Sequence, residues 1–203
     1  MHAFAETYLF MLYHFLRDIW DILRLRYKNP ADYRYSPAVY AAVLLLIGLV
    51  NAAVTEVPLL GKSPAVVTLA VLLTVLLTVL KYGVLSLVMG LMLSRGESKL
   101  PLWGFVLASE ALSVPLLVLF YAPALAAAGM FWQIWIFVAQ AVGLIRMSGR
   151  SGWRVMLGYL VYTVLTILTG SILMMVLAQT GLIDLGALAE QAKVILESPL
   201  QTR

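Results

Sequence analysis

The chain has 203 residues, of which 63% are hydrophobic and 12% are charged, and its formal net charge is +4. Soluble domains are about half apolar and about one quarter charged. This composition excludes a water-soluble globular fold and predicts an all-α, polytopic membrane protein that forms a helical bundle. The sequence contains no cysteine, which excludes disulfides, thiol catalysis and thiolate metal sites.

Residues 1–34 are expected to form a cytoplasmic amphipathic helix and a linker. Charged side chains recur there every three or four residues, and large apolar side chains occupy the opposite helical face. The pattern is typical of a helix in the headgroup plane of a bilayer, but a helix packed against the rest of the protein would show it too. The helix should end near Asn29, because Pro30 disfavours helical geometry in the residue before it. The side chains expected to face lipid headgroups or a protein partner are Arg17, Arg24 and Lys28.

Five apolar segments are predicted to cross the membrane within residues 35–180. A helix needs about 20 residues to cross about 30 Å of hydrocarbon, and each segment reaches or approaches that length. The segments are 37–54, one lying within 64–94, 102–121, 127–145 and 155–177. The last residues, 181–203, are expected to form a short amphipathic tail with a frayed end.

The length of the second segment and a proline in the third determine the shape expected of their helices. Residues 64–94 are too many for one upright helix, so we expect one long, tilted helix. The alternative is a re-entrant hairpin, whose irregular backbone would need protein or water around it. In the third segment Pro115 is expected to kink the helix, because its ring removes one hydrogen bond and crowds the preceding turn.

The distribution of lysine and arginine predicts the orientation of the chain. Ten of these residues fall on the side of the amino terminus and three on the opposite side, with Lys81 inside a span. Because cytoplasmic connections attract lysine and arginine, the amino terminus should be cytoplasmic and the carboxyl terminus outside. The ten are Arg17, Arg24, Arg26, Lys28, Arg34, Arg95, Lys99, Arg146, Arg150 and Arg154, and the three are Lys62, Lys193 and Arg203.

Two ionisable residues, Lys81 and Glu110, fall inside neighbouring spans. Counted from the cationic loop between these spans, Lys81 lies ~21 Å and Glu110 ~16 Å deep at about 1.5 Å per residue. An ion in hydrocarbon costs roughly 2.5 kcal/mol or more, so the two are expected to pair. The pair could serve as a relay for protons or ions, as a polar substrate site, or as a pin that fixes which helices meet. The pin is favoured, because a transport path usually has more polar lining.

Small and amide side chains lie on single faces of the second and fourth spans. Small residues let helix backbones approach closely, and amides hydrogen-bond between helices. We therefore assign a helix-packing role to Ser86, Gly90, Ser94, Gln133, Gln140 and Gly143.

No pattern of catalytic residues is present in the sequence. The chain lacks the HExxH, GxSxG, GxxxxGK[ST] and EF-hand patterns, and no histidine lies within a predicted span to activate a serine. We expect no enzymatic activity, no cofactor and no metal site. The basic residues are spread over three short regions, which argues against a nucleic-acid partner. The expected partners are the lipid bilayer and either another protein or a second copy of the chain.

Residues 100–182 contain an ordered set of features. A glycine-aromatic start is followed by a proline midway along the third span, and then by a Gly-Leu pair, a small-residue turn and a basic residue. The positions are Gly104, Phe105, Pro115, Gly143, Leu144, Ser151 and Arg154. This order resembles the last three spans of the Ypt-interacting-protein (Yip) family, five-span membrane proteins whose bacterial members share these features.

The resemblance implies five spans, a cytoplasmic amino terminus and no intrinsic enzymatic activity. Eukaryotic members bind small GTPases in vesicle trafficking, but this chain lacks their long cytoplasmic region and is more similar to a bacterial inner-membrane protein. The function expected from the sequence is therefore protein or lipid association, in a scaffold or membrane-organising role. The alternative is a small transporter or channel subunit that uses Lys81 and Glu110.

Overall fold

The computed structural model describes residues 2–54, 64–94 and 100–179, and over these residues the chain forms helices and no strand. The all-α prediction is therefore confirmed for the described part of the chain. The helices are α1 (His2–Leu23), α2 (Pro37–Val54), α3 (Pro64–Met92), α4 (Trp103–Glu110), α5 (Leu116–Phe120), α6 (Ala126–Ser148) and α7 (Gly152–Gln179). Short 3-10 turns are η1 (Pro30–Asp32), η3 (Ala111–Ser113) and η4 (Pro123–Leu125).

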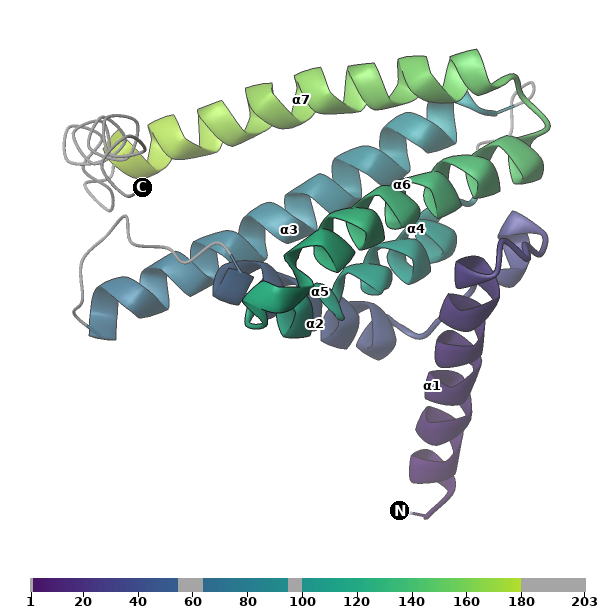
Figure 1. Cartoon of the computed structure of the whole chain (residues 1–203), viewed down its shortest axis with the longest axis horizontal. Coiled ribbons are helices and arrows are strands. Elements are labelled where there is room, and N and C mark those ends of the chain that lie inside the picture. The colour runs from purple at the N-terminus through teal and green to yellow at the C-terminus, as the bar shows by residue number, and fades with distance from the viewer. Residues whose placement is uncertain (1, 55–63, 95–99, 180–203) are drawn as a thin grey trace.

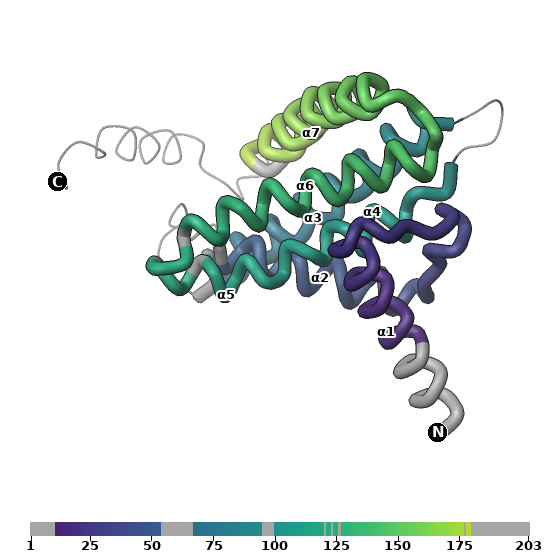
Figure 2. Tube along the Cα trace, turned by 45° about the vertical axis from the view of Figure 1, so that its right-hand side comes forward, coloured from purple at the N-terminus to yellow at the C-terminus, as the bar shows by residue number. Residues whose placement is uncertain are grey.

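Helices α2 to α7 form a bundle, and α1 stands across one end of it (Figure 1). At this end α3 finishes and α6 turns back into α7. Figure 2, from another side, shows α1 leaving the same end of the bundle. Within the bundle, α3 packs against both α2 and α7, and α6 packs against α5, α4 and α7.

Three helices are long and apolar enough to cross a membrane. They comprise Val67–Met92 in α3, Ala127–Ser148 in α6 and Gly152–Val176 in α7, with mean hydropathies of 2.2, 1.6 and 1.9. In α7, none of the most apolar 18-residue stretch is buried within the protein. Exposing such a surface to water would cost about 25 cal/mol for each Å² of apolar area, so this helix is stable where lipid covers it.

The other two predicted spans correspond to shorter apolar helices. These are Pro37–Ala53 in α2 and the stretch Trp103–Leu119, which includes α4 and α5. Each measures about 25 Å at about 1.5 Å per residue, somewhat less than the roughly 30 Å of a hydrocarbon core. Of the five predicted spans, three therefore have helices of full spanning length.

Two expectations about helix continuity can be compared with the structure. Residues 64–92 form one unbroken helix, α3, so the long-helix prediction is confirmed and the hairpin is not formed. Pro115 does more than kink its helix, because the chain passes through η3 before α5 begins at Leu116. At this break the side chain of Trp132 donates a hydrogen bond to the Leu112 carbonyl oxygen at 2.8 Å.

The predicted end of the first helix near Asn29 is wrong. Helix α1 ends at Leu23, and the physical reason is a left-handed turn described below. Several sequence predictions lie outside the described residues. They are the amphipathic tail 181–203 with its Lys193 and Arg203, and the loop cations Lys62, Arg95 and Lys99.

Helix α4 lies in the core, and its residues from Gly104 to Ser109 are all buried. A Cβ atom at Gly104 would lie only 1.8 Å from the Tyr33 carbonyl oxygen, so the chain that follows α1 touches the α4 backbone directly. The ring of Phe105 packs edge-on against Tyr33 and Tyr27, with centroids 5.5 and 6.1 Å apart. This contact fixes the segment after α1 to the bundle.

Replacing Gly104 with alanine should destabilise the protein, because neither backbone can move away cheaply. Overpacking of a core costs about 1–3 kcal/mol, and we expect at least the upper part of that range. The control is Gly83→Ala in α3, where a Cβ would meet nothing within 4 Å. Thermal unfolding of the purified proteins in detergent measures both effects. Equal unfolding temperatures for the two variants would contradict the proposed contact.

Candidate functional site

The carboxyl end of α1 is closed by a left-handed residue. Leu25 has φ 59°, which is unusual for a residue other than glycine. The Leu25 N–H donates to the Ile22 carbonyl at 2.9 Å and the Arg26 N–H donates to the Asp21 carbonyl at 2.8 Å. These two bonds form a Schellman motif, which ends α1 before the position expected from Pro30. Holding leucine in this conformation costs about 1–2 kcal/mol, which contacts elsewhere must offset.

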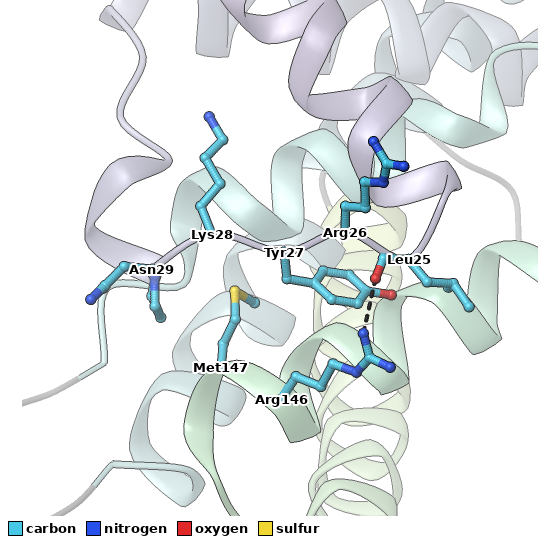
Figure 3. A pocket seen from close by; sticks show the side chains of 8 residues that line it. Leu25, Arg26, Tyr27, Lys28, Asn29, Arg146 and Met147 are labelled. Carbon is cyan, nitrogen blue, oxygen red and sulfur yellow. Dashed lines mark hydrogen bonds between the residues drawn. The ribbon is translucent and has the colours of Figure 1, made fainter.

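Helix α6 supplies those contacts. The Arg146 guanidinium donates to the Leu25 carbonyl oxygen at 3.1 Å (Figure 3), and the Trp135 indole donates to the Leu23 carbonyl oxygen at 3.2 Å. A cation is also favourable at this end of α1, where the helix dipole is negative. In return, the Tyr27 hydroxyl donates to the Ala139 carbonyl oxygen of α6 at 2.8 Å. The end of α1 is therefore held to α6 by three hydrogen bonds.

A buried ion pair joins α1 to the segment that follows it. The Asp18 side chain is 2% exposed; it pairs with the Lys28 ammonium and accepts a hydrogen bond from the Tyr35 hydroxyl at 2.8 Å. The Lys28 ammonium also lies 5.3 Å from the centre of the Tyr33 ring. A buried carboxylate needs such partners, because an isolated charge is very costly in the protein interior.

The tyrosines of this segment stay protonated at neutral pH. Burial raises the pKa of Tyr35 well above its usual value, and the neighbouring Asp18 raises it further. Burial also raises the pKa of Tyr27 and that of Tyr33 to about 12. The hydroxyls of Tyr35 and Tyr27 therefore remain available as hydrogen-bond donors.

A surface groove of about 500 Å³ lies beside this junction, between the segment Leu25–Pro30 and residues Arg146 and Met147 of α6. Figure 3 shows Tyr27 directed toward Arg146, whereas Arg26 and Lys28 point to the other side of the chain. The three cations thus do not converge on one point in the groove. This arrangement suits a structural junction better than an anion-binding site.

Helix α1 has three distinct faces. Phe15, Asp18 and Ile22 are buried against the bundle. A second face leaves large apolar side chains between 45% and 63% exposed, and a third carries exposed arginines. The apolar face consists of Leu12, Tyr13, Leu16 and Trp20, and the arginines are Arg17 and Arg24.

The structure separates the three cations expected to face lipid. Arg17 and Arg24 are exposed, and the Arg24 guanidinium lies 4.3 Å from the centre of the Trp20 ring. Lys28 instead lies beyond the end of α1, where its ammonium is engaged by Asp18.

A second polar cluster lies inside the bundle, around Gln140 of α6. Its amide nitrogen donates to the Ser109 hydroxyl at 2.9 Å and to Glu110 Oε1 at 3.0 Å. Its amide oxygen accepts a hydrogen bond from the Tyr159 hydroxyl of α7 at 2.8 Å. Gln140 thus connects α4, α6 and α7 with every hydrogen-bonding group of its amide near a partner, as polar groups in lipid require.

Lys81 and Glu110 line one small cavity of about 50 Å³, together with Asn51 and Thr78. The predicted ion pair between Lys81 and Glu110 is not formed. Within the described residues, the charged groups that approach closer than 4.0 Å are those of Lys28 and Asp18. Lys81 is exposed, and Glu110 is bonded to Gln140 instead. The cavity is large enough for a water molecule between the two charges, since a water needs about 10–15 Å³ of such space.

The residues assigned to helix packing lie at several contacts. Ser86 is buried, and a Cβ at Gly90 would lie 3.3 Å from the Leu100 carbonyl oxygen. The Ser94 carbonyl oxygen accepts a hydrogen bond from Arg150 at 2.7 Å. A Cβ at Gly143 would lie 2.4 Å from Cζ of Phe105 and 2.7 Å from Cε1 of Tyr27. Gln133 is exposed and lines a groove between α6 and α7.

Sequence reasoning missed the two side chains that organise the α1 junction. Asp18 was not singled out from the sequence, although its spacing from Phe15 and Ile22 puts it on their apolar face. Arg146 was counted only for orientation, and no pattern in the sequence could show that it reaches Leu25. The described residues contain no group of three acidic or histidine side chains that could hold a metal ion.

Comparison with known proteins adds no relative. No protein-family model, curated protein or solved structure matches the chain.

Removing the Lys28 charge should loosen α1 from the bundle, because Asp18 would stay buried without its cation. Breaking a buried pair costs about 3–5 kcal/mol, and since Lys28 is 35% exposed we expect about 2 kcal/mol for Lys28→Met. Adding Asp18→Asn should recover most of this loss, since Tyr35 can still donate to the amide oxygen. Thermal unfolding and the rate of proteolysis within α1 measure the loss of stability in Lys28→Met and its recovery in the double variant.

The matched control is Arg26→Met, which removes one exposed positive charge from the same segment. A loss of stability no larger in Lys28→Met than in Arg26→Met would show that the pair does not hold α1.

Proposed function

We propose that the protein is a non-enzymatic integral membrane protein that acts by association, and that α1 attaches it to the surface of an anionic bilayer. The observation that carries this proposal is the position of α1 across the end of the bundle (Figure 1), with an exposed apolar face beside exposed arginines. A helix of this kind lies in the membrane interface with its apolar side among the acyl chains.

Helix α1 offers both an apolar surface and positive charges for contact with an anionic bilayer. Leu16 and Trp20 are 55% and 51% exposed, so burying them in the interface would remove apolar area from water. Arg17 and Arg24 lie beside them, and each cation near an anionic membrane contributes about 1 kcal/mol. Tryptophan is also a common side chain at the level of the headgroups. The packed face of α1 is occupied by the bundle, so the apolar face is left for lipid.

The proposal includes five membrane crossings with the amino terminus in the cytoplasm, as in Yip proteins of bacterial inner membranes. Its support comes from the two shorter apolar helices beside the three long ones, which together give an odd number of crossings. Arg146, Arg150 and Arg154 lie at or next to the α6–α7 turn, at the same end of the bundle as α1 (Figure 1). Such a concentration of cations is typical of the cytoplasmic side. A protein partner or a second copy of the chain completes the proposed scaffold role.

The absence of cysteine allows a direct test of the lipid contact. A fluorophore on Leu16→Cys should be quenched by quenchers attached to lipid chains when the full-length protein is reconstituted in bilayers with anionic lipid. Replacing Arg17 and Arg24 with glutamine should lower the partition of the apolar face of α1 into the bilayer by about tenfold to thirtyfold. This factor follows because each positive charge contributes about 1 kcal/mol to membrane binding.

The control removes the same number of charges elsewhere, as Arg26→Gln with Arg34→Gln, and should preserve the quenching. Quenching that is equally strong in zwitterionic bilayers and in the Arg17/Arg24 double variant would refute the electrostatic attachment of α1.

A further inference from the structure

Glu110 lines two hollows, and Lys81 lines only one of them. The first is the small cavity of about 50 Å³ that both residues share. The second is a groove of about 400 Å³ between α6 and α7, which Glu110 lines without Lys81. Among the described residues that line this groove, Glu110 is the one whose side chain can carry a formal charge. The carboxylate therefore faces a space in which it has no cationic side chain as partner.

The walls of the groove are mainly aromatic and aliphatic. Phe137 and Tyr159 face each other with ring centroids 5.0 Å apart and planes tilted by 51°. Tyr162, Ile136 and Leu85 are the other apolar lining residues, and the neutral polar ones are Gln133, Gln140 and Thr163. Aromatic faces attract positive charge, and so does a carboxylate in a medium of low dielectric constant. An anion would be repelled here, and a neutral molecule would leave the carboxylate without a counter-ion.

The position of the carboxylate is set before any ligand arrives. Gln140 holds Glu110 Oε1, and the Gln140 amide is itself held by Ser109 and Tyr159. Turning the amide would break these bonds, so Gln140 acts as a positioning residue. A site with a fixed counter-ion loses less freedom on binding, which favours affinity.

The size and opening of the groove indicate the kind of molecule that it accepts. Small-molecule sites have volumes of roughly 300–1,000 Å³, and this groove measures about 400 Å³. Two of its lining residues on α6, Phe137 and Gln133, are exposed, and Phe137 is 43% exposed. The groove thus opens on the apolar surface of two helices long enough to span a membrane. Hard metal ions prefer six or more oxygen ligands and usually several carboxylates. This lining has one carboxylate, and its other side-chain oxygens belong to neutral amides and hydroxyls.

We propose that this groove binds a lipophilic organic cation, a quaternary ammonium or phosphonium ion, with Glu110 as its counter-ion. Phe137 and Tyr159 contact the apolar body of the ligand, which enters from the bilayer. Lys81, which lines the small cavity together with Glu110, is the competing cation of the chain itself. The site is independent of the contact between α1 and lipid.

The test uses two probes of the same shape and opposite charge, tetraphenylphosphonium and tetraphenylborate, with the full-length protein in nanodiscs. Saturable binding of the phosphonium and none of the borate is expected. Glu110→Gln should weaken phosphonium binding by about tenfold or more, because it removes the charge and retains the shape. Phe137→Leu should weaken it by about threefold to tenfold, through loss of the ring face.

Lys81→Met is the informative control, because it removes a charge of the opposite sign near the same carboxylate. It should leave phosphonium binding unchanged or make it tighter. Phosphonium binding by Glu110→Gln as tight as by the wild type would overturn the proposal. So would equal affinity for the borate, which would make the groove a site for acyl chains.

A measurement on the wild-type protein covers the case in which Glu110→Gln does not fold. Dicyclohexylcarbodiimide modifies carboxyl groups in apolar surroundings, and peptide mass spectrometry locates the adduct. The adduct should form on Glu110, and tetraphenylphosphonium, but not tetraphenylborate, should slow its formation. A modification rate that the phosphonium leaves unchanged would also overturn the proposal.

Discussion

The constraint behind this structure is that polar groups in an apolar bundle must find partners within the chain. Several hydroxyls in the long helices bond to carbonyls of their own helix, as Thr163 does to Tyr159 and Thr169 to Leu165, at 2.8 and 2.7 Å. Such bonds satisfy a hydroxyl without linking helices. Other side chains do link helices, as Asn51 of α2 does by donating to the Thr78 hydroxyl of α3 at 3.2 Å. The amide of Gln140 is the clearest of them, since it joins three helices at one point.

The same requirement explains how α1 is oriented. A helix ends with carbonyl groups that lack partners, and those of Leu23 and Leu25 receive theirs from Trp135 and Arg146 of α6. Because these donors sit at fixed positions on α6, they determine the direction in which α1 leaves the bundle. The apolar face of α1 is therefore exposed because the carboxyl end of the helix is held to α6. The strained backbone at Leu25 is retained because it directs a carbonyl oxygen to Arg146.

Composition and periodicity were sufficient to predict the all-α fold and the long helix α3, because these depend on local physics. Pro115 predicted a kink, and the structure has a break there. The end of α1 was not predictable, since leucine seldom adopts a left-handed conformation and only tertiary contacts stabilise it here. The cost of a Glu110 charge in lipid indicated a partner, and Lys81 was the only opposite charge at similar depth. In the structure Glu110 is bonded to Gln140. A neutral amide from a helix distant in sequence cannot be identified by counting charges.

The arrangement around Glu110 also bears on the choice between a pin and a binding site. A direct ion pair would saturate both charges and leave little for a ligand to gain. Here Glu110 is bonded to a neutral amide, Lys81 is exposed, and a small cavity lies between them. The amide positions the carboxylate but does not neutralise it. A carboxylate that is held in place, incompletely compensated and open to an apolar groove has more to gain from a cation than one already paired. The hydrogen bonds of Gln140 connect the helices, so the protein does not need the two charges to meet.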